Sequence, residues 1–239
     1  MTNFQIVTAS KHSEIRVVTA YDAIYGDSLM YVPTFPLEFR DIQSCYPIFF
    51  LKEVETGQFF AAALCGFEPE ENLFLNNGNW DASYLPMMIR RQPFLIAHQT
   101  VDPKSPDQTQ PVISIDRDHP RVGKNEGQRL FSEDGSPSDF LQQAMLLLKK
   151  IHRAHQHNEN FSKTLLQYDL LESLTLDITF NNGSKKSLND FYTINETKLY
   201  ELEGDALAHL NKEGYLQPIF MAIASFSRLR ALIDRRDKP

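Results

Sequence analysis

The stretch YPIFFLKEVETGQFFAAAL, residues 46–64, decides the fold class of this chain. Two apolar, aromatic-rich runs, Tyr46–Leu51 and Phe59–Leu64, lie on either side of a short break that contains Gly57. Such a pattern is typical of two antiparallel strands joined by a turn. We therefore predict a β-hairpin here, and we expect residues 91–99 to add another strand to the same sheet.

Towards the C-terminus the pattern becomes helical. The segment SPSD, residues 136–139, predicts a helix start, in which Ser136 accepts hydrogen bonds from free backbone amides and Pro137 occupies the first helical position. Apolar residues then recur on one face as far as Ile151. A second, shorter helix is predicted over residues 161–172.

A second hairpin is predicted within this helical half. In LTLDITF, residues 174–180, apolar and polar residues alternate, as expected for a strand with one buried face. The following Asn-Asn-Gly turn should place Gly183 in the left-handed region. The return strand is then expected to bury Leu188, Tyr192 and Ile194. Asn195 should cap a helix through about residue 210, and residues 216–233 should form the last helix.

These elements predict an α+β fold, with an antiparallel-rich N-terminal sheet and a C-terminal helical half that contains one β-hairpin. No linker or repeat divides the chain, so we expect residues 1–239 to form a single domain. The 24 basic and 31 acidic residues give a net charge of −7. This balance argues against a nucleic-acid-binding protein.

The N-terminus has no signal-like segment, and the longest apolar run near the C-terminus, residues 219–224, is too short to span a membrane. We therefore expect a cytoplasmic protein. Cys45 and Cys65 are too few for a disulfide framework. Because they lie at similar distances from the predicted turn, they are either a redox pair or two separate thiols.

The most unusual stretch, residues 71–94, contains the only tryptophan, Trp80. Aromatic side chains and arginines together make good ligand anchors. The same residues would equally serve to pack a loop over the sheet, with an acid and an arginine paired. The candidate ligand-binding residues here are Trp80, Asp81, Tyr84, Arg90 and Arg91.

Asp116 completes this candidate set, because it ends a predicted strand, residues 112–115, and Asp118 and His119 follow it. With His98, these residues could form part of a metal-dependent, oxygenase-like site, although the order of ligands differs from the usual compact arrangement. The alternative is that these are ordinary solvent-exposed acidic residues at the end of a strand.

A histidine cluster, His152, His155 and His157, is expected at the end of the long helix, where it is either a metal pair or a solvated helix end. No complete ligand set can be assigned, so we predict no metal and no cofactor. The chain lacks a Gly-x-Ser-x-Gly elbow, a phosphate-binding loop and a dinucleotide fingerprint. No catalytic residue can be assigned, and whether the protein is an enzyme stays open. The basic last turns, which include Arg228 and Arg235, are either a partner surface or a favourable helix end.

Several motifs resemble the SapC family, which is associated with bacterial surface layers. They are YPIFF (46–50), ENLF (71–74), GNWDASYLP (78–86) with the IRRQPF that follows, EGQRLFSEDGSPS (126–138), residues 191–202 and the Gly-Tyr-Leu at 214–216. The resemblance covers nearly the whole chain and supplies no catalytic residues.

The resemblance implies a non-catalytic accessory or binding protein of a bacterial surface-layer, peptide-modification or TonB-dependent uptake system. The implied partners are a flavin-dependent halogenase, a cupin-like protein or a TonB-dependent receptor, and a homo-oligomer is compatible with this role. The alternative is a modifying enzyme with a pocket near residues 80–91 and 116–119.

Overall fold

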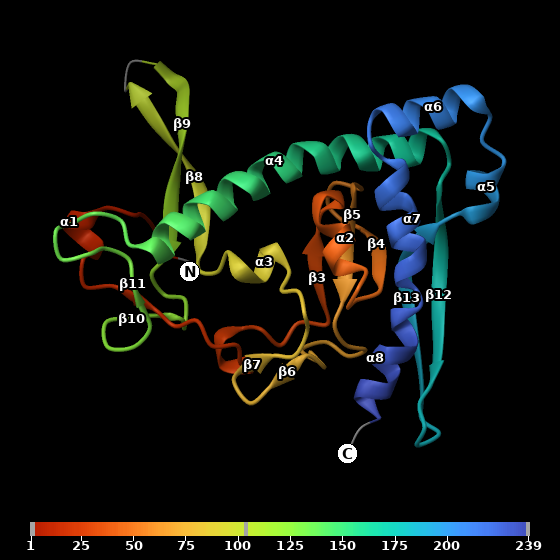
Figure 1. Ribbon diagram of the computed structural model, residues 1–239, viewed down its shortest axis with the longest axis horizontal. Coiled ribbons are helices and arrows are strands. Elements are labelled where there is room, and N and C mark those ends of the chain that lie inside the picture. Colours follow the sequence, from red (N-terminus) through yellow and green to blue (C-terminus); the bar gives the residue numbers. More distant parts are fainter. Residues whose placement is uncertain (1–2, 103–104, 238–239) are drawn as a thin grey trace. The chain divides into compact units, whose positions relative to one another are not determined.

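The computed structural model describes residues 3–102 and 105–237. It has the predicted α+β architecture of helices and antiparallel sheets (Figure 1). The chain forms two compact units. Unit 1 comprises residues up to 27, 77–79 and 87–153, and unit 2 comprises residues 28–76, 80–86 and 154 onwards. The prediction of a single domain stays a prediction.

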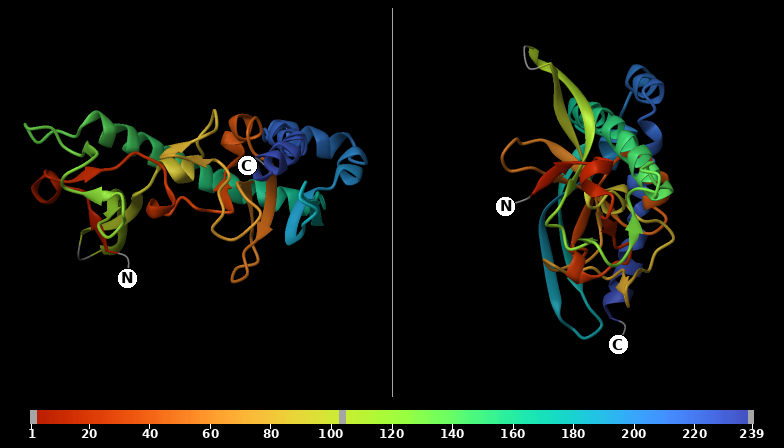
Figure 2. Two further views of the ribbon diagram at one scale, coloured as in Figure 1. Left: turned by 90° about the horizontal axis from the view of Figure 1, so that it is seen from below. Right: turned by 90° about the vertical axis from the view of Figure 1, so that its left-hand side faces the viewer.

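Unit 1 is built on two small sheets. Strands β1 (Phe4–Ile6), β9 (Ser105–Asp116) and β8 (Phe94–Asp102) form the first in that order, and the long β8–β9 hairpin extends away from β1 (Figure 2). Strands β10 (Val122–Gly123), β2 (Arg16–Val17) and β11 (Gln128–Arg129) form the second. Short helical segments α1 (Ala9–His12), η1 (Ala23–Tyr25) and α3 (Met87–Arg90) complete the unit.

The expectation that residues 91–99 join the sheet of residues 46–64 is wrong. They contribute to β8, which pairs with β9 instead, and the predicted strand 112–115 is the end of β9. The physical reason is local: β9 follows at once and offers β8 an antiparallel partner, while the outer edge of Phe59–Leu64 is already paired by Tyr31–Thr34.

One long helix, α4 (Asp139–Gln167), begins in unit 1 and ends in unit 2. Its cap is Ser138, whose Oγ accepts from the Leu141 amide at 3.2 Å, whereas the predicted cap, Ser136, donates to Asp134 instead. In unit 1 its buried residues Leu141, Ala144 and Leu148 belong to a hydrophobic core. The other members of this core are Ile15, Val17, Phe94, Ile115, Leu130 and Phe131.

The prediction of two helices over residues 139–172 is also wrong, because α4 continues without a break. Buried residues at 151, 154, 161 and 165 maintain the helical period through the histidine run, which contains no glycine or proline. The three histidines therefore lie in the interior of the helix, away from the favourable dipole end that was expected.

Unit 2 contains a five-stranded antiparallel sheet in the order β12 (Leu171–Thr179), β13 (Lys185–Ile194), β4 (Ile48–Lys52), β5 (Phe59–Leu64) and β3 (Tyr31–Thr34). The predicted hairpin at residues 46–64 is confirmed as β4–β5, with Ile48 opposite Ala63 and Gly57 at φ +70°. A two-stranded ribbon, β6 (Leu75–Asn76) and β7 (Asn79–Trp80), lies where the chain passes between the units.

The β12–β13 hairpin is confirmed, with Gly183 at φ +79°. However, β13 carries a bulge: Asn189 and Asp190 together face Thr175, and Asp190 has φ +66°. The extra residue reverses which side chains face inward beyond it. Phe191 is therefore buried, and Tyr192, which was predicted to be buried, is only half-buried.

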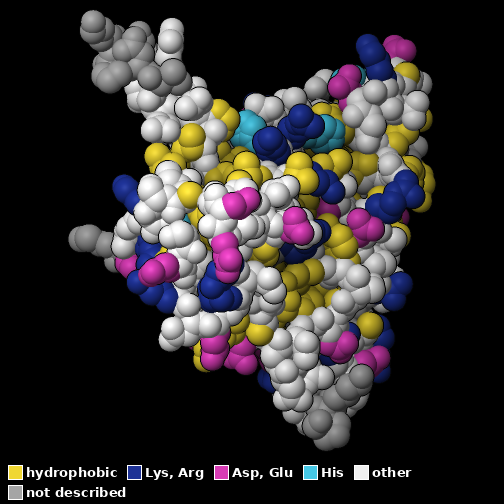
Figure 3. Space-filling view, turned by 60° about the vertical axis from the view of Figure 1, so that its left-hand side comes forward, with side chains coloured by type: hydrophobic (Ala, Val, Ile, Leu, Met, Phe, Trp, Pro, Cys, Tyr) yellow, Lys and Arg dark blue, Asp and Glu magenta, His cyan; other side chains and the backbone are white. Residues whose placement is uncertain are grey.

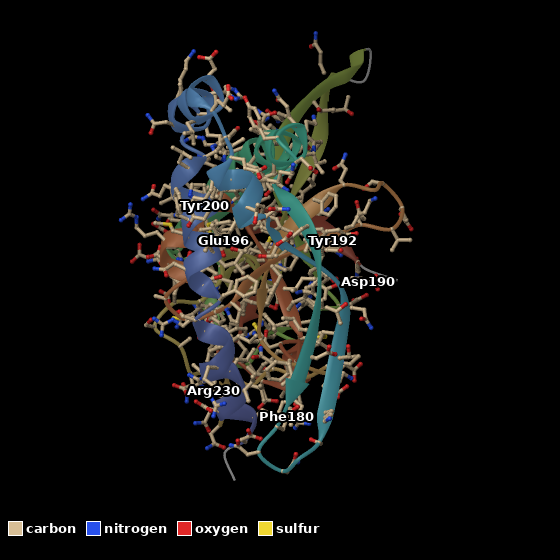
Figure 4. The ribbon with its side chains drawn as sticks, turned by 90° about the vertical axis from the view of Figure 1, so that its right-hand side faces the viewer. Phe180, Asp190, Tyr192, Glu196, Tyr200 and Arg230 are labelled. Carbon is tan, nitrogen blue, oxygen red and sulfur yellow. The ribbon has the colours of Figure 1, made fainter. Side chains whose placement is uncertain are left out.

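Helices cover this sheet. The described helices of unit 2 besides α4 are η2 (Pro36–Glu38), α2 (Phe39–Ile42), α5 (Glu196–Tyr200), α6 (Gly204–Lys212), α7 (Leu216–Ser225) and α8 (Arg228–Arg236). Asn195 caps α5 as predicted, accepting from the Lys198 amide at 2.9 Å. The predicted single helix through about residue 210 is wrong, because α5 ends at Tyr200 and α6 begins at Gly204. The two C-terminal helices run beside β12 and β13 (Figure 4), and Arg236 lies 5.8 Å from the ring centre of Phe180 at the hairpin end.

Residues 216–236 are long and apolar enough to cross a membrane by length and composition. It is the one such segment among residues 3–102 and 105–237, and core helices of soluble proteins share this property. The segment is divided in the structure, because α7 ends at Ser225 and α8 begins at Arg228.

Candidate functional site

Trp80 is held in unit 2 by hydrogen bonding and by ring packing. Its Nε1 donates to the hydroxyl of the fully buried Tyr46 at 2.7 Å, and that hydroxyl donates to the Tyr84 carbonyl at 2.6 Å. Its indole plane lies 11° from the ring plane of Phe74, with centroids 6.4 Å apart. Burial raises the pKa of Tyr46 well above its usual range, so this hydroxyl stays a donor.

Asp81, the next residue, is paired with the last helix. Arg235 Nη1 lies 2.8 Å from Asp81 Oδ2, and Arg235 Nη2 donates to the Asp81 carbonyl at 2.9 Å. The same guanidinium lies 4.5 Å from the ring centre of Phe74. The pair ties α8 to the segment after β7, and the cation–π contact fixes the orientation of the guanidinium.

Trp80, Asp81 and Arg235 are among the residues that line a cavity of about 410 Å³. This volume is within the usual range for small-ligand sites. We name it the Trp80 cleft. Its lining residues are Ser44, Cys45, Phe74, Trp80, Asp81, Ala82, Ser83, Arg228, Ala231 and Arg235. It therefore combines an aromatic surface, two arginines, one carboxylate and three small polar groups.

Cys45 contributes a thiol to the lining of the cleft. Burial works against its thiolate, but hydrogen bonds from Ser44, Ser83 and the backbone near Tyr84 outweigh burial and lower the pKa of the thiol below its usual value. Its Sγ lies 3.0 Å from Ser83 Oγ. Cys65 is fully buried, which raises its pKa strongly. Both are free thiols, so the structure shows two separate cysteines and no disulfide.

Tyr84 does not line the cleft. Its hydroxyl donates to Glu38 Oε2 at 2.9 Å, and the Thr34 hydroxyl donates to Glu38 Oε1 at 2.8 Å. Glu38 and Thr34 are both buried. Tyr84 thus belongs to a polar network in which one buried carboxylate accepts from two hydroxyl groups.

The other three predicted residues belong to unit 1. Arg91 Nη1 donates to the Phe94 carbonyl at 3.0 Å, and burial lowers the pKa of its guanidinium. Asp116 accepts from the backbone amides of Asn3 and Asp118, each at 3.2 Å. Arg90 is exposed at the end of α3.

Arg91 and Asp116 are electrostatic neighbours of His119. Burial lowers the pKa of His119, Arg121 and Arg91 lower it further, and Asp116 and Asp27 oppose them. His98 is exposed on β8. Over residues 3–102 and 105–237, no group of three or more His, Cys, Asp or Glu side chains is arranged to hold a metal ion.

Of the six predicted residues, the structure therefore places Trp80 and Asp81 in the cleft. The sequence reasoning missed the partners that complete it, chiefly Cys45, Arg228 and Arg235. The basic last turns were a signal for the two arginines, but nothing in the sequence spacing joins residues 228–235 to residue 80.

Comparison with known proteins identified a family. The family model described as SapC matches residues 7–232 of the chain. No curated protein and no solved structure matches it.

Proposed function

Because the chain belongs to the SapC family, we propose that it is an accessory protein that binds a ligand in the Trp80 cleft without transforming it. The observation that carries this proposal is the composition of the cleft. It presents an oriented indole beside two arginines, and its lining includes no histidine or lysine that could serve as a general base. Its single carboxylate, on Asp81, is paired with Arg235.

The charges of the cleft indicate the chemistry of the ligand. Arg235 is neutralised by Asp81, whereas Arg228 is exposed and has no ion-pair partner among the described residues. One net positive charge next to an indole suits a planar group joined to a carboxylate. An aromatic amino acid at the C-terminus of a peptide has this chemistry.

Fluorescence of Trp80, the only tryptophan of the chain, tests the proposal. N-acetylphenylalanine should change the emission saturably, and its amide, which lacks the carboxylate, should bind about tenfold more weakly. The variant Arg228→Gln should abolish this preference. Arg230→Gln is the matched control, because Arg230, labelled in Figure 4, lies on the same helix and is not a lining residue of the cleft. Its guanidinium is paired with Asp234. Equal affinity of the two probes for the unmodified protein would refute the proposal.

We also propose the cellular role that the resemblance implies: handling of a peptide or surface component in a bacterial surface-layer, peptide-modification or TonB-dependent uptake system. The proposed partners are a flavin-dependent halogenase, a cupin-like protein or a TonB-dependent receptor. Affinity purification from cell extract should recover one of these classes with the unmodified chain. Recovery of none of them would contradict this part of the proposal.

A second candidate, a modifying enzyme, rests on the lowered pKa of Cys45 inside the cleft. It requires that Cys45 react with the bound ligand. Intact-mass measurement after incubation with extract should then show an adduct that Cys45→Ser lacks. If the mass is unchanged under conditions in which the cleft binds its probe, only the binding role is supported and the enzyme role is contradicted.

A further inference from the structure

Unit 1 contains a second cavity, which is apolar and separate in composition from the Trp80 cleft. Its volume is about 360 Å³. Strands β1, β8 and β9 supply one wall, and the first half of α4 supplies the other. We name it the apolar groove, and its lining residues are Ile6, Val7, Ile96, Pro111, Val112, Ile113, Phe131, Pro137, Leu141, Met145, Leu148 and Lys149.

A positive charge lies at one end of this groove. Lys149 is the only charged lining residue, and Met145, Lys149 and Arg153 follow one another at intervals of four along α4, which places them in one row on the helix. Lys149 and Arg153 are exposed, and neither has an ion pair among the described residues. In Figure 3, hydrophobic side chains (yellow) lie next to the β8–β9 hairpin at the upper left, and basic side chains (dark blue) lie to the right of them.

The lining favours an alkyl chain over a peptide backbone as the buried occupant. Strand β9 pairs with β8 along this wall and with β1 only over Ser114–Asp116, and its apolar sheet face lines the groove. Eleven of the twelve lining residues are apolar. A buried peptide would leave amide groups without hydrogen-bond partners, which is costly. A plain alkyl chain has no such groups.

We propose that the apolar groove binds a linear alkyl carboxylate, a fatty acid, with its chain against Ile96, Val112 and Met145 and its carboxylate at Lys149 and Arg153. Lys149 and Arg153 are positively charged, whereas the net charge of the chain is −7. The attraction of a carboxylate is therefore local to these two residues. The proposal does not depend on the ligand of the Trp80 cleft.

Titration calorimetry with decanoate, below its aggregation concentration, tests the proposal. Decanoate should bind one to one, and octanoate, which is shorter by two methylenes, should bind about tenfold more weakly. Decyltrimethylammonium, which has the same chain and the opposite charge, should bind more weakly than decanoate. The double variant Lys149→Gln/Arg153→Gln should weaken decanoate about fivefold and should remove its advantage over the cation.

Two further variants separate binding from folding. Lys150→Gln changes a neighbouring exposed lysine outside the lining and should leave decanoate binding unchanged. Met145→Gln alters a half-buried lining residue and should weaken both amphiphiles, with a thermal melt confirming that the protein is folded. Equal binding of decanoate and the cation, or no binding of decanoate, overturns the proposal. Binding of an acidic apolar peptide without decanoate would assign the groove to a protein partner and would also overturn it.

Discussion

Arg121 Nη2 lies 2.5 Å from Asp27 Oδ2 in unit 1, and the two side chains are only 3% and 0% exposed. The guanidinium is also placed between two rings, with its carbon 5.1 Å from the centre of Tyr21 and 4.9 Å from that of Tyr25. It donates to the carbonyls of Val18 and Ala20 as well. One buried cation thus holds together several turns of irregular chain between β2 and η1.

Removal of the acid from this pair should destabilise the protein strongly. Asp27→Ala leaves the Arg121 charge buried without its carboxylate, and we expect a loss of about 3–5 kcal/mol in the free energy of unfolding. Urea denaturation measures it. The matched control is Lys124→Met, which removes an ion pair with Glu14 whose side chains are 64% and 74% exposed and should change stability by less than about 1 kcal/mol. Similar losses for both variants would show that burial does not set the value of the Asp27 pair.

The two cysteines should differ in reactivity. Iodoacetamide should alkylate Cys45 in the folded protein and leave the buried Cys65 unmodified, as peptide mass spectrometry can show. Because hydrogen bonds lower the pKa of Cys45, its reaction rate should rise with pH earlier than that of an ordinary thiol. Ser83→Ala removes one of these hydrogen bonds and should move the rise to higher pH. Equal labelling of both cysteines without denaturant would contradict the structure.

Tyr46→Phe should loosen the Trp80 cleft. The variant removes the acceptor of the Trp80 indole and the donor to the Tyr84 carbonyl, and it should cost about 1–3 kcal/mol in the free energy of unfolding. The tryptophan emission should also change, because the indole loses a fixed partner. Tyr200→Phe, at a 74% exposed side chain on α5, is the control and should alter neither property. A stable Tyr46→Phe protein with unchanged emission would argue against this hydrogen-bond chain.

Stability should fall in mild acid because of His12. This side chain is fully buried, and burial lowers its pKa below the usual value of 6.5. Well above pH 6.5 it is neutral in both states; as the pH falls through this value, the unfolded chain binds a proton that the folded chain does not, so the unfolded state gains stability relative to the folded state. Denaturation at several pH values should show a shallower loss for His12→Gln than for the parent. Parallel curves would mean that His12 does not contribute.

The fold was predictable where one segment carries its own signal. The β4–β5 hairpin, the turn at Gly183 and the cap at Asn195 each depend on a few adjacent residues, and all three are confirmed. The errors arose where the outcome depends on distant partners or on a backbone conformation that the residue types do not fix. The assignment of β8 to a sheet depended on which strand edge was free, and the burial of Phe191 depended on a backbone conformation at Asp190 that residue type alone does not specify.

The candidate site shows the same limit. Trp80 and Asp81 were identifiable because an aromatic residue and charges occur close together in the sequence. Arg235, which pairs with Asp81 across a separation of 154 residues, became a site residue only through the packing of α8. Three of the four remaining predicted residues, Arg90, Arg91 and Asp116, lie in the other unit, because local proximity in sequence does not keep residues 80 and 90 within one compact body.

The bulge at Asp190 lets the β12–β13 hairpin tolerate the loss of one residue. Removal of Asn189 or Asp190 would restore regular pairing and would leave Leu188 and Phe191 two residues apart, which keeps both on the buried face. A length change in the exposed turn at residues 181–184 alters neither face. Relatives of this chain should therefore vary in length at the turn, or by one residue at the bulge, and keep apolar residues at the positions of Leu188 and Phe191.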